Sequence, residues 1–163
     1  MNDIKLVHLN EIEEEKLLNL MNHEMVGKLM PLLKNGFSKE DCQNFLQAKK
    51  ELWNNHGFGP WAFIINDKFA GWGGLQPEGV EADFALVLHP DFWGWGFKIF
   101  NKIKNMAFEQ MNIDSITILF PPSRKNIKAV TRFGFIKDGE LDIAGEKFIR
   151  LRLNKPLDLL QNP

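Results

Sequence analysis

The stretch from Leu88 to Phe97 has the composition of a turn that can hold an anionic ligand. It joins an apolar segment, expected to be a buried strand, to a helix pattern, and it contains the closely spaced glycines Gly94 and Gly96. Glycine lets the main chain approach a ligand, and the first N–H groups of a helix carry a partial positive charge. The turn could therefore bind a diphosphate, although a plain tight connection between strand and helix would show the same residues.

A dinucleotide-binding fold is one alternative for this glycine pair. In that fold a third glycine follows within the same turn, and the turn belongs to the first strand and helix of the domain. Here Ile99 occupies the third position, and two predicted helices precede the first hairpin. These departures disfavour the dinucleotide fold.

The elements that must position this turn follow the order βααβββαβαββ, which predicts a mixed α/β sheet flanked by helices. Apolar residues at period two or at helical period, together with turn residues, define the boundaries. Ser38 with Asp41 three positions later resembles a capping box at one helix start. The expected elements are a strand at 4–8, a helix at 11–25, a helix at 38–55, strands at 61–65, 69–75 and 81–88, a helix at 94–111, a strand at 115–120, a short helix at 123–132, and two closing strands around an Asp138-Gly139 turn.

Length and composition favour one domain over residues 1–163. The chain is 44% hydrophobic, which suffices for a packed core, and its formal net charge of -1 offers no attraction for nucleic acid or an anionic membrane. The single cysteine, Cys42, cannot form an intramolecular disulfide and is expected to be buried, and no apolar stretch is long enough to span a bilayer. We expect a cytoplasmic protein with no metal site and with neither nucleic acid nor membrane as a partner.

Two signatures resemble those of the GNAT acetyltransferases, closest to the branch of ribosomal-protein N-acetyltransferases. The segment Asp83–Phe97 has an acidic residue at the start of a strand, a Leu-His-Pro end and a Trp-Gly-x-Gly-aromatic turn. The segment Ser123–Phe135 is similar to the second signature, a polar helix start followed by a Gly-Phe strand entry. Both occur in the expected order, and the resemblance covers roughly residues 61–153.

The resemblance implies the GNAT fold, in which the fourth and fifth strands of a mostly antiparallel sheet splay apart, and it implies acetyl-coenzyme A as cosubstrate. The pantetheine arm would meet the fourth strand, the diphosphate would meet the turn amides, and polar side chains would touch the thiol end. Carried over residue by residue, the three groups are Val87, Leu88 and His89 for pantetheine; Trp93, Gly94, Trp95, Gly96, Phe97 and Lys98 for the diphosphate; and Ser123 and Asn126 for the pantetheine or thiol end.

The implied chemistry is direct transfer of the acetyl group to an amine, which needs a positioned uncharged amine, a donor for the carbonyl oxygen and a proton acceptor. Asp83 matches the acidic position of the family and is the first candidate for the base, followed by Glu81 and Glu78. An ordinary strand carboxylate paired with a lysine is the alternative for Asp83. Backbone N–H groups of the splayed strand could serve as the carbonyl donor.

The chain departs from the family pattern at three places. Trp95 replaces a frequent lysine in the turn, and Asp91 stands where many members carry Gln or Arg, so diphosphate binding would depend on main-chain donors. Many members use a tyrosine to protonate the departing thiolate, but this chain has no tyrosine. Ser123, Asn126 or water would have to substitute for it.

The leading hypothesis is an N-acetyltransferase acting on a protein N-terminus or a small-molecule amine, as a monomer or homodimer. A catalytically silent module that binds acyl-coenzyme A is the alternative from another class, and a nucleic-acid-binding domain is a third that the charge balance disfavours. The acceptor depends on the first two helices and their loops, whose composition is ordinary, so the sequence does not identify it.

Overall fold

The computed structural model describes residues 4–33, 35–79, 81–122 and 127–157, and within them the strands form one seven-stranded sheet. The order across the sheet is β1-β2-β3-β4-β5-β7-β6, and neighbours pair antiparallel except β4 and β5, which run parallel. The predicted mixed α/β sheet is confirmed. The strands are β1 (Ile4–Val7), β2 (Pro60–Ile65), β3 (Lys68–Glu78), β4 (Glu81–Leu88), β5 (Ser115–Phe120), β6 (Ile136–Ile143) and β7 (Glu146–Asn154).

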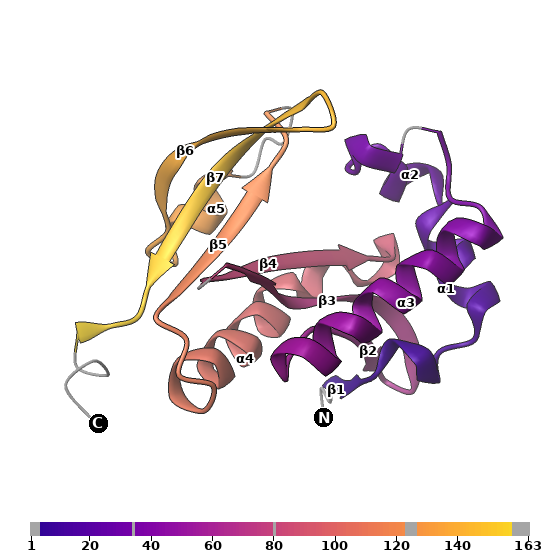
Figure 1. Cartoon of the computed structure of the whole chain (residues 1–163), viewed down its shortest axis with the longest axis horizontal. Helices are drawn as coiled ribbons and strands as arrows, with labels where there is room; N and C mark the ends of the chain where they lie inside the picture. Colours follow the sequence, from indigo (N-terminus) through magenta and orange to yellow (C-terminus); the bar gives the residue numbers. More distant parts are fainter. Residues whose placement is uncertain (1–3, 34, 80, 123–126, 158–163) are drawn as a thin grey trace.

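Helices cover both faces of the sheet (Figure 1). α4 (Gly96–Glu109) packs on one face, where its apolar residues meet side chains such as Phe84 of β4. α1 (Glu14–Met21) and α3 (Lys39–His56) cover the other face, where Val87 of β4 is buried. Successive strand residues point to opposite faces, so β4 serves both cores. The shorter helical elements are η1 (Leu9–Glu11), α2 (Glu24–Gly27), η2 (Pro31–Leu33), η3 (Pro90–Trp95) and α5 (Ile127–Thr131).

The predicted capping box fixes the start of α3. The Asp41 N–H donates to Ser38 Oγ at 3.0 Å, and the Ser38 N–H donates to Asp41 Oδ2 at 2.9 Å. Two backbone donors that the first turn would leave free are thereby satisfied. Cys42 follows directly and is fully buried, as expected.

The single helix predicted over 11–25 is wrong, because the chain leaves the helix at Asn22 and begins a second one at Glu24. The Asn22 side chain exchanges hydrogen bonds with Phe37, accepting from its N–H at 2.9 Å and donating to its C=O at 2.8 Å. His23 is extended and accepts the Met25 N–H on its ring nitrogen. Tertiary hydrogen bonds thus override the helical period.

The closing turn predicted at Asp138-Gly139 is also wrong. Both residues lie inside β6, where the register with β7 shifts between Lys137 and Glu140, and Gly139 has φ +96°. The hairpin turns six residues later, at Ala144 and Gly145, both with positive φ, as a two-residue turn of the I′ kind requires. The bulge keeps Asp138 within reach of β7.

Candidate active site

A gap opens in the centre of the sheet because β4 and β5 pair only at their beginnings. Their register contains Ala82 with Ile116, Asp83 with Thr117 and Phe84 with Ile118, and among the described residues it goes no further. Beyond this point β5 turns away from β4 (Figure 1). The predicted separation of the fourth and fifth strands is therefore present, and it starts just after Phe84.

Within the described part of the chain, the open edge of β4 leaves the N–H groups of Leu86 and Leu88 and the Leu86 carbonyl without a partner strand, while the Leu88 carbonyl accepts from Trp93. The His89 N–H donates to the Ala70 carbonyl of β3 at 2.8 Å, and in an antiparallel pair successive residues direct their backbone groups to alternate sides. The groups of Val87 therefore also face β3, while those of Leu86 and Leu88 face the gap. Of the three residues predicted to meet pantetheine, only Leu88 has its backbone there; Leu86, which was not predicted, is the second.

The predicted helix from Gly94 to Met111 begins two residues later, because Pro90–Trp95 forms a turn of 3-10 helix. α4 starts at Gly96 with no side-chain cap from Trp95 and with no acidic residue in its first turn. No side chain from Trp95 thus occupies its first N–H groups, and this end carries the positive pole of the helix dipole. Those two features suit an anion.

Neither glycine of the turn is needed for the backbone shape. Gly96 has φ -55° and ψ -40°, an ordinary helical conformation, and a Cβ there would meet only Leu86 Cδ2, at 3.3 Å. A Cβ on the exposed Gly94 would meet nothing within 4 Å. What a side chain at Gly94 would obstruct is therefore the space outside the turn, where a ligand would approach.

The aromatic residues of the turn have different roles in the fold. The Trp93 indole Nε1 donates to the Leu88 carbonyl at 2.9 Å and so closes the turn onto the strand end. Phe97 is 56% exposed, and its ring packs at a tilt against that of Phe133, with ring centroids 4.5 Å apart. The ammonium of Lys98 lies 5.0 Å from the Trp95 ring centroid, which holds a cation beside the uncapped start of α4.

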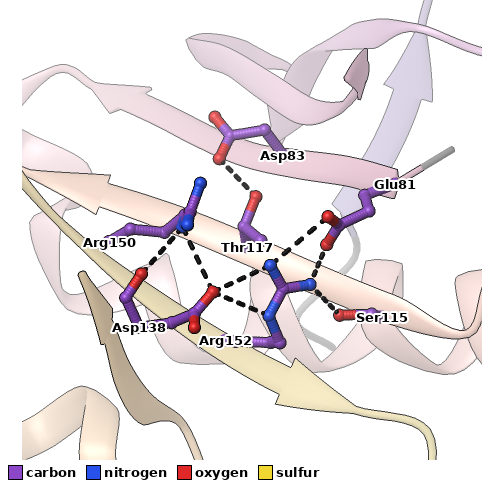
Figure 2. Close-up of polar contacts among 7 residues, drawn as sticks. All are labelled: Glu81, Asp83, Ser115, Thr117, Asp138, Arg150 and Arg152. Atoms are coloured by element: carbon purple, nitrogen blue, oxygen red, sulfur yellow. Dashed lines mark hydrogen bonds and ion pairs between the residues drawn. The ribbon is translucent and has the colours of Figure 1, made fainter. Parts of the chain in front are cut away.

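Asp83 lies where the strands begin to separate, on the face of the sheet opposite α4. The Thr117 hydroxyl donates to Asp83 Oδ1 at 2.8 Å, and the other carboxylate oxygen points away from it (Figure 2). Burial raises the pKa of Asp83 to about 6, against the hydrogen bond from Thr117, which lowers it; Glu78 raises it further and Arg150 lowers it. A carboxylate that titrates near neutrality suits general base catalysis.

The other two carboxylates of the sequence analysis have different environments. Glu81 holds the Arg152 guanidinium, which also contacts Asp138 Oδ2 at 2.8 Å and donates to Ser115 Oγ at 2.8 Å (Figure 2). Glu78 is exposed at the end of β3. Glu81 is therefore occupied in an ion pair and Glu78 lies in solvent, whereas Asp83 is partly buried at the start of the gap and keeps one oxygen open.

Arg150 completes this network between β7 and the bulge of β6. Its Nε donates to the Asp138 carbonyl at 2.9 Å and lies 3.2 Å from Asp138 Oδ2 (Figure 2). The two arginines and their two carboxylate partners, Glu81 and Asp138, balance in charge. The network thus anchors the outer half of the sheet beside Asp83 without adding net charge.

Lys49 of α3 reaches the face of the sheet on which Asp83 lies. It approaches over β3, whereas the arginines approach from β7. Its ammonium binds Gln76 Oε1 and lies over the rings of Phe45 and Trp72, 5.2 and 5.5 Å from their centroids. Gln76 is the partner of Asp83 in the register of β3 and β4. Residues opposite each other in a sheet share a face, so Lys49 lies one side chain away from Asp83.

The structure brings most predicted site residues to one region, the open end of β4 and the start of α4. The ring Nδ1 of His89 accepts the Asp91 N–H at 3.1 Å, and the ring lies 5.1 Å from that of His23. Ser123 and Asn126 lie outside the described residues. Sequence reasoning missed Thr117, Lys49, Gln76 and the arginine network.

The sequence contained a signal for the polar network around Asp83: three strands each carry two polar residues that are two positions apart. The pairs are Glu81 with Asp83, Ser115 with Thr117, and Arg150 with Arg152. Period-two spacing puts each pair on one face of its strand.

The described residues contain neither a cluster of metal ligands nor a membrane-spanning helix. Within residues 4–33, 35–79, 81–122 and 127–157, no group of three or more His, Cys, Asp or Glu side chains could hold a metal ion. No helix in these ranges is long and apolar enough to cross a membrane.

A mostly antiparallel sheet whose one parallel pair opens beside an uncapped helix start is the architecture of GNAT acetyltransferases. Residues 4–135 match the family model described as acetyltransferase (GNAT) domain. The chain therefore belongs to the GNAT family and is an acetyltransferase.

Solved structures share this fold at low sequence identity. An acetyltransferase from Agrobacterium tumefaciens aligns with a TM-score of 0.73 and 16% identity, covering 93% of this chain and 90% of that one. A spermidine N-acetyltransferase from Vibrio cholerae, in complex with CoA and spermine, gives 0.64 and 19%, covering 94% and 95%. RimL, a ribosomal L7/L12 alpha-N-protein acetyltransferase in complex with coenzyme A, gives 0.69 and 15%, covering 93% of each chain.

Proposed function

We propose that this chain transfers an acetyl group from acetyl-coenzyme A directly to an amine, with Asp83 as the general base. One observation carries the proposal. Asp83, with an open carboxylate oxygen and a pKa of about 6, lies where β4 and β5 begin to separate. A thioester lying in the gap would reach an acceptor amine at this point.

The cosubstrate would extend from the start of α4 to Asp83. From Phe84 to His89 an extended strand covers about 17 Å at 3.3 Å per residue. The gap along Leu86 and Leu88 thus connects the apex of the splay with the uncapped helix end. The diphosphate would lie against residues 93–98, and Ser123 and Asn126 stay predicted contacts of the thiol end.

In the proposed reaction the neutral amine attacks the thioester carbonyl carbon. The Leu86 N–H faces the gap nearest its apex and would donate to the carbonyl oxygen as negative charge develops there. Asp83 would accept the proton from the amine nitrogen, directly or through water, as the C–S bond breaks. The departing thiolate needs a proton, and in a chain without tyrosine Ser123, Asn126 or water would supply it.

Transfer and binding are tested separately. We would measure acetyl transfer across a panel of amines and peptides, and acetyl-coenzyme A affinity by calorimetry, for the natural chain and for Gly94→Glu. A side chain at position 94 meets open space, so the variant should fold, but its charge should repel a diphosphate and lower affinity at least tenfold.

Gly27→Glu is the matched control, because a Cβ at Gly27 also meets nothing within 4 Å. It should bind acetyl-coenzyme A like the natural chain. Equal affinity in both variants would refute the proposed diphosphate site. Tight binding without transfer to any amine would favour the silent acyl-coenzyme A module.

A further inference from the structure

Lys49 is a cation on the acceptor side of the sheet with no carboxylate partner among the described residues. Its ammonium contacts the amide oxygen of Gln76 and the faces of two aromatic rings, and burial lowers its pKa. A half-buried ammonium without a counter-ion costs free energy, because water is removed and no opposite charge replaces it. The described part of the fold therefore supplies no anion for Lys49.

The position of Lys49 relates it to the proposed base. Gln76 and Asp83 exchange backbone hydrogen bonds across β3 and β4, a type of pair whose Cα atoms lie about 5.5 Å apart. The side chains of both point to the face that α3 covers. An acceptor with its amine at Asp83 would therefore place its next few atoms within reach of the Lys49 ammonium.

The charges around Asp83 and the Lys49 ammonium favour an anion between them. Arg150 lowers the pKa of Asp83 from the β7 side, while Lys49 approaches from the α3 side. Glu81 and Asp138 are already paired with arginines, and Glu78 is exposed at the strand end. A long polycation would meet cations on both sides of Asp83, whereas an acceptor with one carboxylate would gain a partner.

We infer that Lys49 binds a carboxylate of the acceptor, so that the substrate is an amine with a carboxylate within a few bonds of its nitrogen. Free amino acids have this chemistry, and so do peptides whose first residue is acidic. The inference rests on the proposed function and names its substrate class. Lys49 is in this view a specificity residue, while Asp83 takes the proton.

The first test uses matched acceptors with the natural chain. Phenylalanine is compared with phenethylamine, and the amide of Asp-Ala with the amide of Asn-Ala. A neighbouring carboxylate changes the pKa of an amine, so kcat/KM is expressed per concentration of unprotonated amine. We expect the carboxylated member of at least one pair to be preferred tenfold or more, and the pair that shows it tells amino acids from peptides.

The second test changes Lys49 itself. Lys49→Met keeps the apolar stem over the rings but removes the charge, and it should lower the preference ratio at least tenfold through KM of the carboxylated acceptor. Lys49→Arg should keep the ratio within about threefold. Lys50→Met, at the exposed neighbour on the same helix, should leave it unchanged.

The outcomes separate the two levels of inference. If carboxylated and decarboxylated amines are acetylated equally well, or the ratio survives in Lys49→Met, the carboxylate site is wrong while the acetyltransferase proposal stands. If no acceptor is acetylated and acetyl-coenzyme A does not bind, the proposed function itself fails. The natural-chain panel decides the inference even if a Lys49 variant unfolds, because preference for the decarboxylated members would overturn it.

Discussion

Thr117 donates its hydroxyl hydrogen to Oδ1 of Asp83 across the short stretch in which β4 and β5 still pair. Thr117 is only 4% exposed, so the donor is held in place by the sheet. The bond orients the carboxylate and leaves its other oxygen open. Burial raises the pKa of Asp83, whereas this hydrogen bond stabilises the charged carboxylate and lowers the pKa.

Replacing Asp83 by Asn should remove proton transfer and keep the cosubstrate site. The amide still accepts from Thr117 but cannot take a proton, so kcat should fall roughly 100-fold or more. The dissociation constant for acetyl-coenzyme A, measured by calorimetry, should change less than about twofold. Asp142→Asn, at an exposed position of β6, serves as the control. A Asp83→Asn variant with full activity would exclude Asp83 as the base.

The dependence of kcat/KM on pH, per concentration of unprotonated amine, should show a limb that rises through about pH 6, because Asp83 must be ionised to accept a proton. Two neighbours should move this limb in opposite directions. Glu78→Gln removes a repelling charge and should shift it to lower pH. Thr117→Val removes a donor to the carboxylate and should shift it to higher pH. Shifts of the same sign in both variants would contradict this reading of the site.

The same carboxylate should cost stability above pH 6. A carboxyl whose pKa is higher in the folded than in the unfolded chain binds its proton more tightly when folded, so its contribution to stability is lost as pH rises from about 4 to 6. Asp83→Asn should therefore raise the free energy of unfolding at pH 8 by about 1–3 kcal/mol.

Urea unfolding of both chains at pH 4 and pH 8 measures this difference, which should nearly vanish at pH 4. Asp142→Asn should show no comparable gain at pH 8. A Asp83→Asn variant less stable than the natural chain at pH 8 would mean that the carboxylate supports the fold rather than straining it.

The turn between β4 and α4, where we propose that the diphosphate binds, could be predicted because its residues are neighbours in sequence. The turn, its glycines and the capping box at Ser38 depend on contacts within a few positions. Asp83 with Thr117 depends on the parallel register of two strands joined through α4, and Lys49 with Gln76 on how α3 docks on the sheet. Local patterns do not determine such distant contacts.

The misplaced closing turn has a similar cause. Asp138-Gly139 has the better local turn residues, but turning there would lose the ladder from Glu140 to Ile143 with β7. The chain instead uses Gly139 for a bulge and turns at Ala144 and Gly145. Pairing over the whole strand outweighed the local preference.

Arg152 should matter more for folding than an exposed cation of the same sheet. It is 19% exposed and joins β4, β5 and β6 through Glu81, Ser115 and Asp138. Arg152→Met would leave the half-buried Glu81 carboxylate unpaired and Asp138 with Arg150 alone, and it should cost about 2 kcal/mol of unfolding free energy. Lys137→Met breaks only the exposed pair with Glu140 and should cost less than about 0.5 kcal/mol. Equal losses in urea unfolding would show that the network adds no stability.

The unpaired edge of β4 also makes the central strand a local weak point of the fold. An amide that has no partner strand exchanges its hydrogen with solvent from the native state, without waiting for global unfolding. The amide hydrogens of Leu86 and Leu88 should therefore exchange much faster than those of Val87 and Ala85, which β3 protects. A ligand that pairs with this edge would complete the sheet in place of a strand, and slower exchange at these two amides would reveal it residue by residue.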